Sequence, residues 1–210
     1  RSVPVLSLKR AMAKPFSTSD VLNDWLYHLV WEVSDLPKSL DNEKAGSWLF
    51  LADNGGVTDA LLPLMREAGQ KVYVAKSTNA ACAFLSSEDG EGLSGVLHLW
   101  AMDSRESKPD DFLLASLEVV QVLNQVGGTG KHWFVTKGAQ AVTDNDAVLP
   151  WQSQFWGFGR TLQVELPEAL GGCIDLNPTL DEKLIDLDML ITEILSNNSE
   201  TEVAFRNEIR

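Results

Sequence analysis

Residues 47–52 read SWLFLA and residues 53–56 read DNGG, and this junction decides the fold class of the chain. A strand that is apolar at successive positions needs cover on both of its faces, which in practice means a parallel sheet with crossover helices. The polar, glycine-containing segment then ends the strand and turns the chain. We therefore expect an α/β fold in which residues 48–52 form a strand buried on both faces.

Short apolar runs of the same kind recur along the chain, and stretches with helical spacing separate them. Strands are predicted at residues 48–52, 71–75, 96–101, 132–136, 173–176 and 202–206. Helices are predicted at residues 58–68, from 110 to a stop at 127, and at 181–196. This alternation predicts a doubly wound, mostly parallel sheet flanked by helices on both faces.

Each of the two longer predicted helices carries one apolar face. The expected stripes contain Leu113, Leu117, Val120 and Leu123 in the first helix, and Leu184, Leu187, Ile191 and Ile194 in the second. The helix at residues 58–68 contains Pro63, which removes a backbone hydrogen bond and clashes with the preceding turn. That helix is therefore expected to start late or to bend.

Two features precede the first strong strand. Residues 1–24 mix basic residues, serines and prolines and are expected to be a linker. Residues 27–33 read YHLVWEV, a β-branched and aromatic run that is typical of a strand. A further strand is therefore predicted there, before a polar break at residues 37–45.

Composition excludes several classes of function. The net charge of −13 and the pI near 4.6 work against a nucleic-acid partner, because such binding relies on clustered Lys and Arg. No apolar run approaches the length of a membrane span, and the first residues lack the pattern of a secretory signal, so a soluble cytoplasmic protein is expected. Cys82 and Cys173 lack partners at metal-binding spacing and are expected to be free thiols, with no metal site.

Two glycine-rich turns raise the question of a phosphate site. The turn at residues 52–57 has Gly55 and Gly56 but lacks the spaced third glycine of a dinucleotide fingerprint, so a structural turn is favoured. An autonomous nucleotide-binding reductase that uses this turn stays open as an alternative. The segment at residues 127–130, GGTG, follows a helix and leads into a strand, which indicates a helix stop.

The sequence offers few candidate catalytic groups. A short-chain reductase needs a tyrosine with a lysine one helical turn later, yet Tyr27 is followed by Trp31 and Tyr73 by Ser77 at that spacing. The histidines occur within or at the start of predicted strands and are interpreted as core or edge residues with satisfied ring nitrogens; they are His28, His98 and His132. No serine lies in a GxSxG nucleophile motif.

A third hypothesis is a receiver-like signalling domain. Acidic doubly wound domains bind Mg²⁺ at the carboxyl ends of their strands. Asp53 or Asp103 would act with Lys137 in such a site. The missing acidic pair at the end of the first strand counts against this interpretation.

A longer motif favours a further interpretation over these two alternatives. Residues 150–176 read PWQSQFWGFGRTLQVELPEALGGCIDL, and this segment strongly resembles the structural subdomain of ketoreductases from modular polyketide synthases. Residues 27–31 resemble the opening YxxxW of that family, and residues 202–206 resemble the strand that precedes its catalytic subdomain. The motif positions are Trp31, Trp156, Gly157, Gly159, Arg160, Glu165, Pro167, Gly171, Gly172 and Asp175.

The resemblance implies a truncated Rossmann-like fold that has lost its nucleotide site. Residues 25–210 would be the structural subdomain, and residues 1–24 a linker whose segment 3–11 more weakly resembles the tail of a dehydratase domain. The resemblance also implies that the chain holds no catalytic, cofactor-binding or metal-binding residue of its own. It would stabilise an adjacent NADPH-binding subdomain in cis, which reduces a β-ketoacyl chain on an acyl carrier protein among the other synthase domains.

Family resemblance also assigns a role to the helix around residues 155–162. It would occupy the place where a complete reductase has its catalytic tyrosine helix. Its bulky Phe155 and Trp156 suggest packing instead of catalysis. Trp151, Trp156 and Phe158 offer large apolar side chains, some of which are expected to face the partner half.

Overall fold

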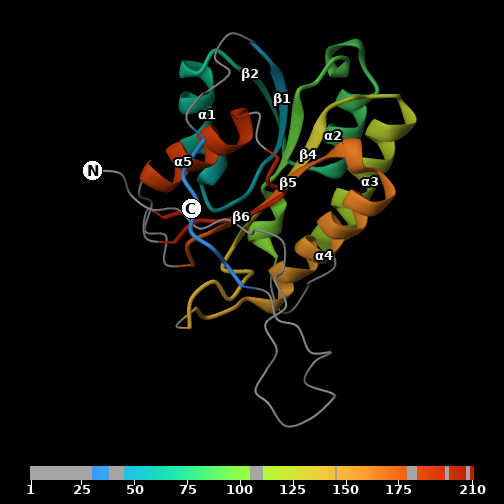
Figure 1. Ribbon diagram of the computed structural model, residues 1–210. Coiled ribbons are helices and arrows are strands. Elements are labelled where there is room, and N and C mark those ends of the chain that lie inside the picture. Colours follow the sequence, from blue (N-terminus) through green and yellow to red (C-terminus); the bar gives the residue numbers. More distant parts are fainter. Residues whose placement is uncertain are drawn as a thin grey trace.

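Six parallel strands form one sheet in the computed structural model, in the order β2-β1-β3-β4-β5-β6 (Figure 1). The structure describes residues 30–37, 45–104, 111–144, 146–178, 184–196, 199–206 and 209–210. The strands are β1 (Ser47–Leu51), β2 (Lys71–Ala75), β3 (Gly95–His98), β4 (Lys131–Lys137), β5 (Leu170–Leu176) and β6 (Glu202–Ala204). Each neighbouring pair in this order is parallel, which confirms the predicted Rossmann-like, doubly wound sheet.

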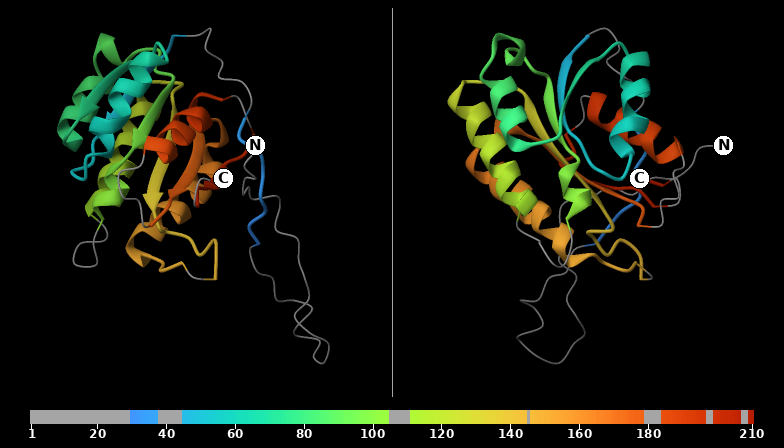
Figure 2. Two further views of the ribbon diagram at one scale, coloured as in Figure 1. Left: turned by 90° about the vertical axis from the view of Figure 1, so that its left-hand side faces the viewer. Right: turned by 180° about the vertical axis from the view of Figure 1, so that it is seen from behind.

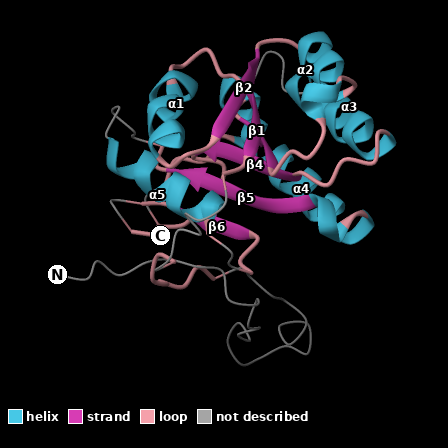
Figure 3. Cartoon of the chain, turned by 90° about the horizontal axis from the view of Figure 1, so that it is seen from above, coloured by secondary structure: helices cyan, strands magenta, loops and turns pink. Residues whose placement is uncertain are grey.

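Helices cover both faces of the sheet. They are α1 (Val57–Glu67), α2 (Thr78–Leu85), α3 (Asp111–Gln125), α4 (Pro150–Glu165) and α5 (Leu184–Leu195). Helices α1 and α5 lie on one face, and α2, α3 and α4 lie on the other (Figures 2 and 3). In the described ranges, short 3-10 helices also occur at η2 (Glu88–Gly90), η3 (Trp100–Asp103) and η4 (Pro167–Ala169). None of the helices that the structure describes is long and apolar enough to cross a membrane.

The strand β1 shows why an unbroken apolar run specifies this fold. Trp48 and Phe50 belong to the core cluster beneath α1 and α5, whereas Leu49 and Leu51 belong to the cluster beneath α2 and α3. All four side chains are buried. Because successive side chains of a strand point to opposite faces, both faces of β1 must be apolar.

Several predicted boundaries differ from the structure. The strand predicted at 96–101 ends at His98, and η3 begins at Trp100. The strand predicted at 173–176 begins earlier, at Leu170, since Gly171 and Gly172 continue β5 instead of forming a turn. The strand predicted at 202–206 ends at Ala204.

The predicted strand at residues 27–33 is not part of the sheet where the structure describes it. Residues 30–33 belong to none of the six strands, and residues 27–29 lie outside the described part. Trp31 instead packs edge-on against Trp156, with ring centroids 5.8 Å apart. The aromatic Trp31, which had suggested a strand, thus makes a packing contact instead.

The helices also differ in detail from expectation. Of the two outcomes expected from Pro63, a late start is not what the structure shows, because α1 begins at Val57 and continues past the exposed Pro63 to Glu67. In α3, Ser116 and Val119 are buried with Val120 and Leu123, whereas the predicted Leu113 and Leu117 are only half-buried. In α5, Leu187, Ile191 and Ile194 are buried as predicted.

The C-terminal residue of the described part is tied back to its first segment. The Arg210 guanidinium forms an ion pair with the fully buried Glu193 of α5, with 2.5 Å between Nε and Oε2. The same guanidinium donates a hydrogen bond to the backbone carbonyl of Asp35 at 3.0 Å. The segments around residues 35 and 210 therefore meet at one place on the body of the molecule.

Candidate functional site

The turn between β1 and α1 is held by one carboxylate. Asp53 accepts hydrogen bonds from the backbone N–H groups of Val57 at 3.0 Å and Thr58 at 2.7 Å, and from the Thr58 hydroxyl at 2.6 Å. Gly56 has a φ of 93° just before the helix, a conformation that favours glycine. Asp53 therefore uses the N–H groups that would otherwise be free at the start of α1.

A second carboxylate fixes the same turn from the other side. Asp103, at the end of η3, accepts hydrogen bonds from the backbone N–H of Asn54 at 2.9 Å and from its side-chain Nδ2 at 2.8 Å. Asp53 and Asp103 thus both contact this turn. Lys137, the third residue of the receiver-like hypothesis, is the last residue of β4. In the part of the chain that is described, no three His, Cys, Asp or Glu side chains are grouped to hold a metal ion.

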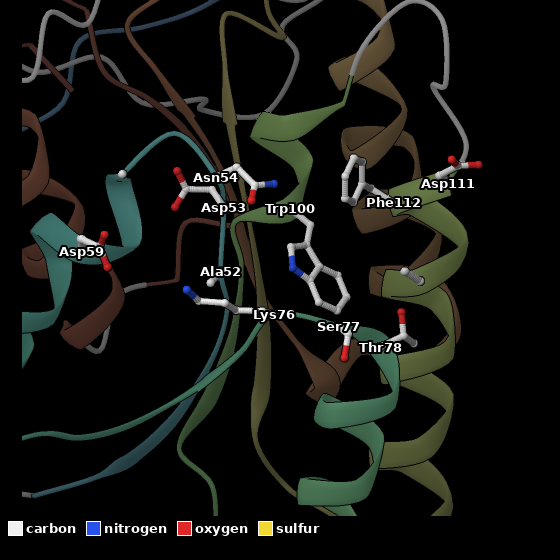
Figure 4. A pocket seen from close by; sticks show the side chains of 12 residues that line it. Ala52, Asp53, Asn54, Asp59, Lys76, Ser77, Thr78, Trp100, Asp111 and Phe112 are labelled. Carbon is white, nitrogen blue, oxygen red and sulfur yellow. The ribbon is translucent and has the colours of Figure 1, made fainter.

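A pocket of about 430 Å³ opens beside this turn, at the carboxyl ends of β1 and β2 (Figure 4). Its walls include Asp53 and Asp59 on the α1 side, Lys76 after β2, and Trp100 and Phe112 on the opposite side. Sequence reasoning considered the glycines of this turn and Asp53, but it missed Asp59, Lys76, Trp100 and Phe112. They come from elements far apart in the chain, so no local motif marks them.

The second glycine-rich segment is a helix stop, as predicted. Gly127 has a φ of 70°, and its N–H donates to the carbonyl of Asn124 at 3.1 Å. The N–H of Gly128 donates to the carbonyl of Leu123 at 2.9 Å. These bonds satisfy carbonyls at the end of α3, and the chain then enters β4 at Lys131.

The one tyrosine in the described part of the chain lies on β2, near the sheet edge. The Tyr73 ring packs on Phe84 with centroids 4.4 Å apart, and the Lys71 amine lies 4.6 Å from the Tyr73 ring centroid. Tyr27 and His28 lie outside the described residues. The described tyrosine therefore sits in a strand and contacts an aromatic neighbour.

Two of the predicted core histidines form a buried pair. His98 on β3 and His132 on β4 are fully enclosed, and His98 Nε2 lies 2.9 Å from His132 Nδ1. Burial lowers the pKa of His132 to about 4, and burial together with the nearby His132 lowers the pKa of His98 well below its ordinary value. The expectation of satisfied ring nitrogens was wrong for His98, whose Nδ1 lacks a hydrogen-bond partner among the described residues.

The motif residues Trp156 and Asp175 belong to one buried hydrogen-bond network. The Trp156 indole N–H donates to the Thr136 hydroxyl at 2.9 Å, and that hydroxyl donates to Asp175 at 2.6 Å. Asp175 also accepts the backbone N–H of Ala139 at 2.7 Å and pairs with the Arg206 guanidinium at 2.6 Å. This network joins α4, β4, β5 and the segment after β6.

Three further motif residues, Arg160, Glu165 and Pro167, are exposed. Arg160 of α4 forms an ion pair with Glu202 of β6, with Nε and Oε1 2.5 Å apart. Its guanidinium also lies 5.9 Å from the Trp156 ring centroid. Glu165 ends α4 and Pro167 begins η4, and both are exposed. The ion pair of Arg160 ties α4 to β6, and the sequence motif gave no indication of this partner.

The glycines of the motif differ in their surroundings. A Cβ at Gly159 would overlap the sulfur of the buried Cys173, and a Cβ at Gly171 would overlap the Trp133 indole. At Gly172 the nearest atom would be 3.0 Å away, again on Trp133. At Gly157, in the same helix as Gly159, a Cβ would meet nothing within 4 Å. Gly159 therefore permits close packing of α4 on β5, whereas nothing described in the chain requires Gly157.

Alanine at Gly159 and alanine at Gly157 are therefore expected to change stability in opposite directions. Gly159→Ala should lower the free energy of unfolding by about 1–3 kcal/mol, because the core beside Cys173 is overpacked. Gly157→Ala should raise it by about 0.5–1 kcal/mol, because alanine favours a helix more than glycine does. Urea unfolding of both variants measures the two changes.

Cys173→Ala in the Gly159→Ala background is the control, since it removes the sulfur that the new methyl group would meet. It should recover part of the loss. Changes of the same sign at both glycines would contradict this description of α4. Cys173 and Cys82 are both free cysteines, as expected.

Comparisons with known proteins show which proteins are similar to this chain in sequence. No protein-family model matches the chain. The chain is 30% identical over 205 residues to the polyketide synthase GfsA of Streptomyces halstedii, a match that covers 87% of this chain and 3% of that protein. It is 31% identical over 211 residues to the pikromycin polyketide synthase component PikAII of Streptomyces venezuelae, covering 91% and 6%. The chain thus spans less than a tenth of the length of these two relatives.

A solved structure gives the corresponding comparison in three dimensions. A C2-type ketoreductase from a modular polyketide synthase superposes with a TM-score of 0.66 at 28% identity, covering 79% of this chain and 38% of that chain. Sequence and fold thus point to the same group of proteins. On both counts the chain is a relative of modular polyketide synthases and corresponds to part of a ketoreductase of that family.

Proposed function

We propose that this chain is the structural, non-catalytic half of a ketoreductase in a modular polyketide synthase. It docks on a catalytic half in cis, which binds NADPH and reduces a β-ketoacyl chain held on an acyl carrier protein. The match to the solved ketoreductase covers 79% of this chain but 38% of that chain, which leaves a larger second part outside the match. That division supports a two-part reductase.

The β1–α1 turn is the observation that carries the proposal. In dinucleotide-binding folds, free N–H groups at this helix N-terminus approach the pyrophosphate. Here the N–H groups of Val57 and Thr58 already donate to the Asp53 carboxylate. A pyrophosphate at this place would face a negative charge and would find these donors occupied. The turn therefore favours a half without a dinucleotide site.

The position of Tyr73 supports the same conclusion. A reductase tyrosine needs a cation one helical turn later to lower the pKa of its phenol. Tyr73 lies on strand β2 and packs on Phe84, and the residue four positions later is Ser77. This arrangement supports a reaction centre supplied by the other half.

The outer face of α3 and α4 is the surface we propose for docking. The two helices lie side by side (Figure 2), and Val120 of α3 shares a core cluster with Phe155 and Leu162 of α4. On the outer side, Leu114 is 62% exposed and Val164 is 82% exposed. Each of the two helices thus exposes one large apolar side chain, which a docked partner would remove from water.

Gly157 supports this choice of face. It is exposed in the middle of α4, where a glycine costs the helix about 1 kcal/mol relative to alanine. A Cβ there would meet nothing within 4 Å, so packing inside the described chain does not explain the glycine. A helix of the catalytic half that approaches α4 closely would explain it.

Charges placed on this face test the docking. In a ketoreductase that contains both halves, Leu114→Glu with Val164→Glu should lower the rate of NADPH oxidation with a β-ketoacyl thioester about tenfold, the cost of roughly 1.4 kcal/mol of lost docking energy. Both side chains are exposed, so the stability of this chain should change by about 0.5 kcal/mol or less. Val74→Glu is the matched control, because Val74 is 41% exposed on the opposite edge strand β2.

A fluorescence titration with NADPH tests the division of labour. The 210-residue chain alone should show no saturable binding, and the same chain continued through its catalytic half should bind. Tight binding of NADPH by the chain alone would overturn the proposal and restore the nucleotide-binding alternative. A catalytic half that folds and reduces its substrate equally well without this chain would overturn the scaffold role.

A further inference from the structure

A pair of histidine rings joins the two central strands of the sheet. Strands β3 and β4 are the third and fourth of the six in the sheet order. His98 lies opposite Phe134 in the β3–β4 register, and His132 precedes Phe134 by two positions on β4. Both rings therefore stand on the same face of the sheet. There His98 Nε2 lies 2.9 Å from His132 Nδ1, which is hydrogen-bond distance.

The contact between the rings depends on their protonation. In a neutral imidazole one ring nitrogen donates and the other accepts, so one histidine of the pair donates and the other accepts. A proton on the accepting nitrogen would turn it into a second donor and break the bond. A proton on His98 Nδ1 would find no acceptor, because that atom lacks a hydrogen-bond partner among the described residues. The pair is therefore suited to two neutral rings.

Apolar side chains enclose the pair. His98 is 0% exposed and His132 is 1% exposed. The His98 ring packs on the Phe134 ring with centroids 4.5 Å apart, and Phe134 belongs to the core cluster beneath α4. In the part of the chain that the structure describes, α2, α3, α4 and η3 bury no charged side chain against this face of the sheet. A positive charge on either ring would therefore lie in surroundings of low polarity.

The titratable groups on the surrounding elements do not offset such a charge. Burial raises the pKa of the two thiols, Cys82 of α2 and Cys173 of β5, which therefore stay neutral. The Asp175 carboxylate of β5 pairs with the Arg206 guanidinium at 2.6 Å, and Asp103 of η3 accepts a backbone N–H of the β1–α1 turn. The charged side chains of α3 and α4 are exposed; they are Asp111, Glu118, Arg160 and Glu165.

The stability of the folded chain is therefore coupled to pH at this point. The pKa of His132 is lowered to about 4 by burial, whereas a histidine in an unfolded chain has a pKa of about 6.5. The unfolded chain thus binds protons that the folded chain excludes. The stabilisation from neutral rings is complete above about pH 6.5 and is lost as the pH falls from there toward about 4.

We propose that the His98–His132 pair is an acid-sensitive lock, which holds β3 to β4 at neutral pH and releases them when it takes up protons. The pair lies beneath the helices and takes no part in the proposed docking.

Urea unfolding of the 210-residue chain at several pH values tests the lock. Between about pH 7 and about pH 5.5 the equilibrium constant for unfolding should rise about eightfold for each buried neutral histidine, and so about sixtyfold for the pair. His98→Leu with His132→Leu removes both titrations and keeps the carboxylates, so this sixtyfold rise should be missing from its pH dependence. His28→Gln is the matched control, because it changes the third histidine of the sequence and retains the pair.

Equal pH dependence in the wild-type chain and the double variant would overturn the proposal. The same holds if nitrogen NMR of the folded chain shows either ring as an imidazolium at about pH 5.5, since both rings should still be neutral there. Should the double variant fail to fold, His132→Gln keeps a hydrogen-bonding group and removes one titration. Its pH dependence should then be about eightfold weaker than that of the wild-type chain. Each of these results leaves the docking of the two halves untouched.

Discussion

Replacing Arg206 by methionine is expected to lower the free energy of unfolding by about 3–5 kcal/mol. The guanidinium is buried and forms ion pairs with Asp175 at 2.6 Å and Asp146 at 2.8 Å. It also donates to four backbone carbonyls, those of Gln140, Asp175, Leu176 and Phe205. Methionine fills much of the volume but leaves the fully buried Asp175 without its cation.

Urea unfolding measures this loss, and Arg160→Met is the matched control. Arg160 also pairs with a carboxylate, but its side chain is 43% exposed, so the same substitution should cost about 1 kcal/mol or less. A loss at Arg206 no larger than that at Arg160 would show that burial does not govern the strength of these two pairs.

Replacing Trp156 by alanine is expected to lower the free energy of unfolding by about 3–5 kcal/mol. The side chain is among the largest in the core, and its ring packs edge-on against Trp31. Trp156→Phe should cost less, about 1–2 kcal/mol, since it keeps an aromatic ring and removes the N–H that bonds Thr136. The same unfolding experiment compares the two variants.

The two large effects should not add. Trp156 and Arg206 reach the same carboxylate, one through the Thr136 hydroxyl and the other directly. Residues in one hydrogen-bond network couple by about 0.5–3 kcal/mol in double-mutant cycles. If the loss in the double variant Trp156→Phe with Arg206→Met equals the sum of the two single losses, the two residues are not coupled through Thr136.

The fold could be predicted because its signal is local. In the run SWLFLA every position after Ser47 is apolar, and the structure buries alternate residues of β1 on opposite faces. The alternation of such runs with helical patterns then specified the parallel sheet. Errors arose where a local signal had a different cause, as at Gly171, which continues β5 against Trp133, and at Trp31, which packs on Trp156.

Partners across the sheet could not be predicted from spacing. His98 and His132 are 34 residues apart and meet only because β3 pairs in parallel with β4. Lys76, Trp100 and Phe112 line one pocket from the end of β2, from η3 and from α3. The register of strands and the packing of helices decide such contacts, and a single sequence does not encode them in any one window.

The contact between Arg210 and Asp35 has a consequence for the order of events in folding. Both segments meet at one point, where the buried Glu193 anchors the arginine. Contacts between residues that are far apart in sequence form only after the entropy of closing a long loop has been overcome. The Arg210 side chain is therefore expected to reach its partners late, after the sheet that carries α5 has formed.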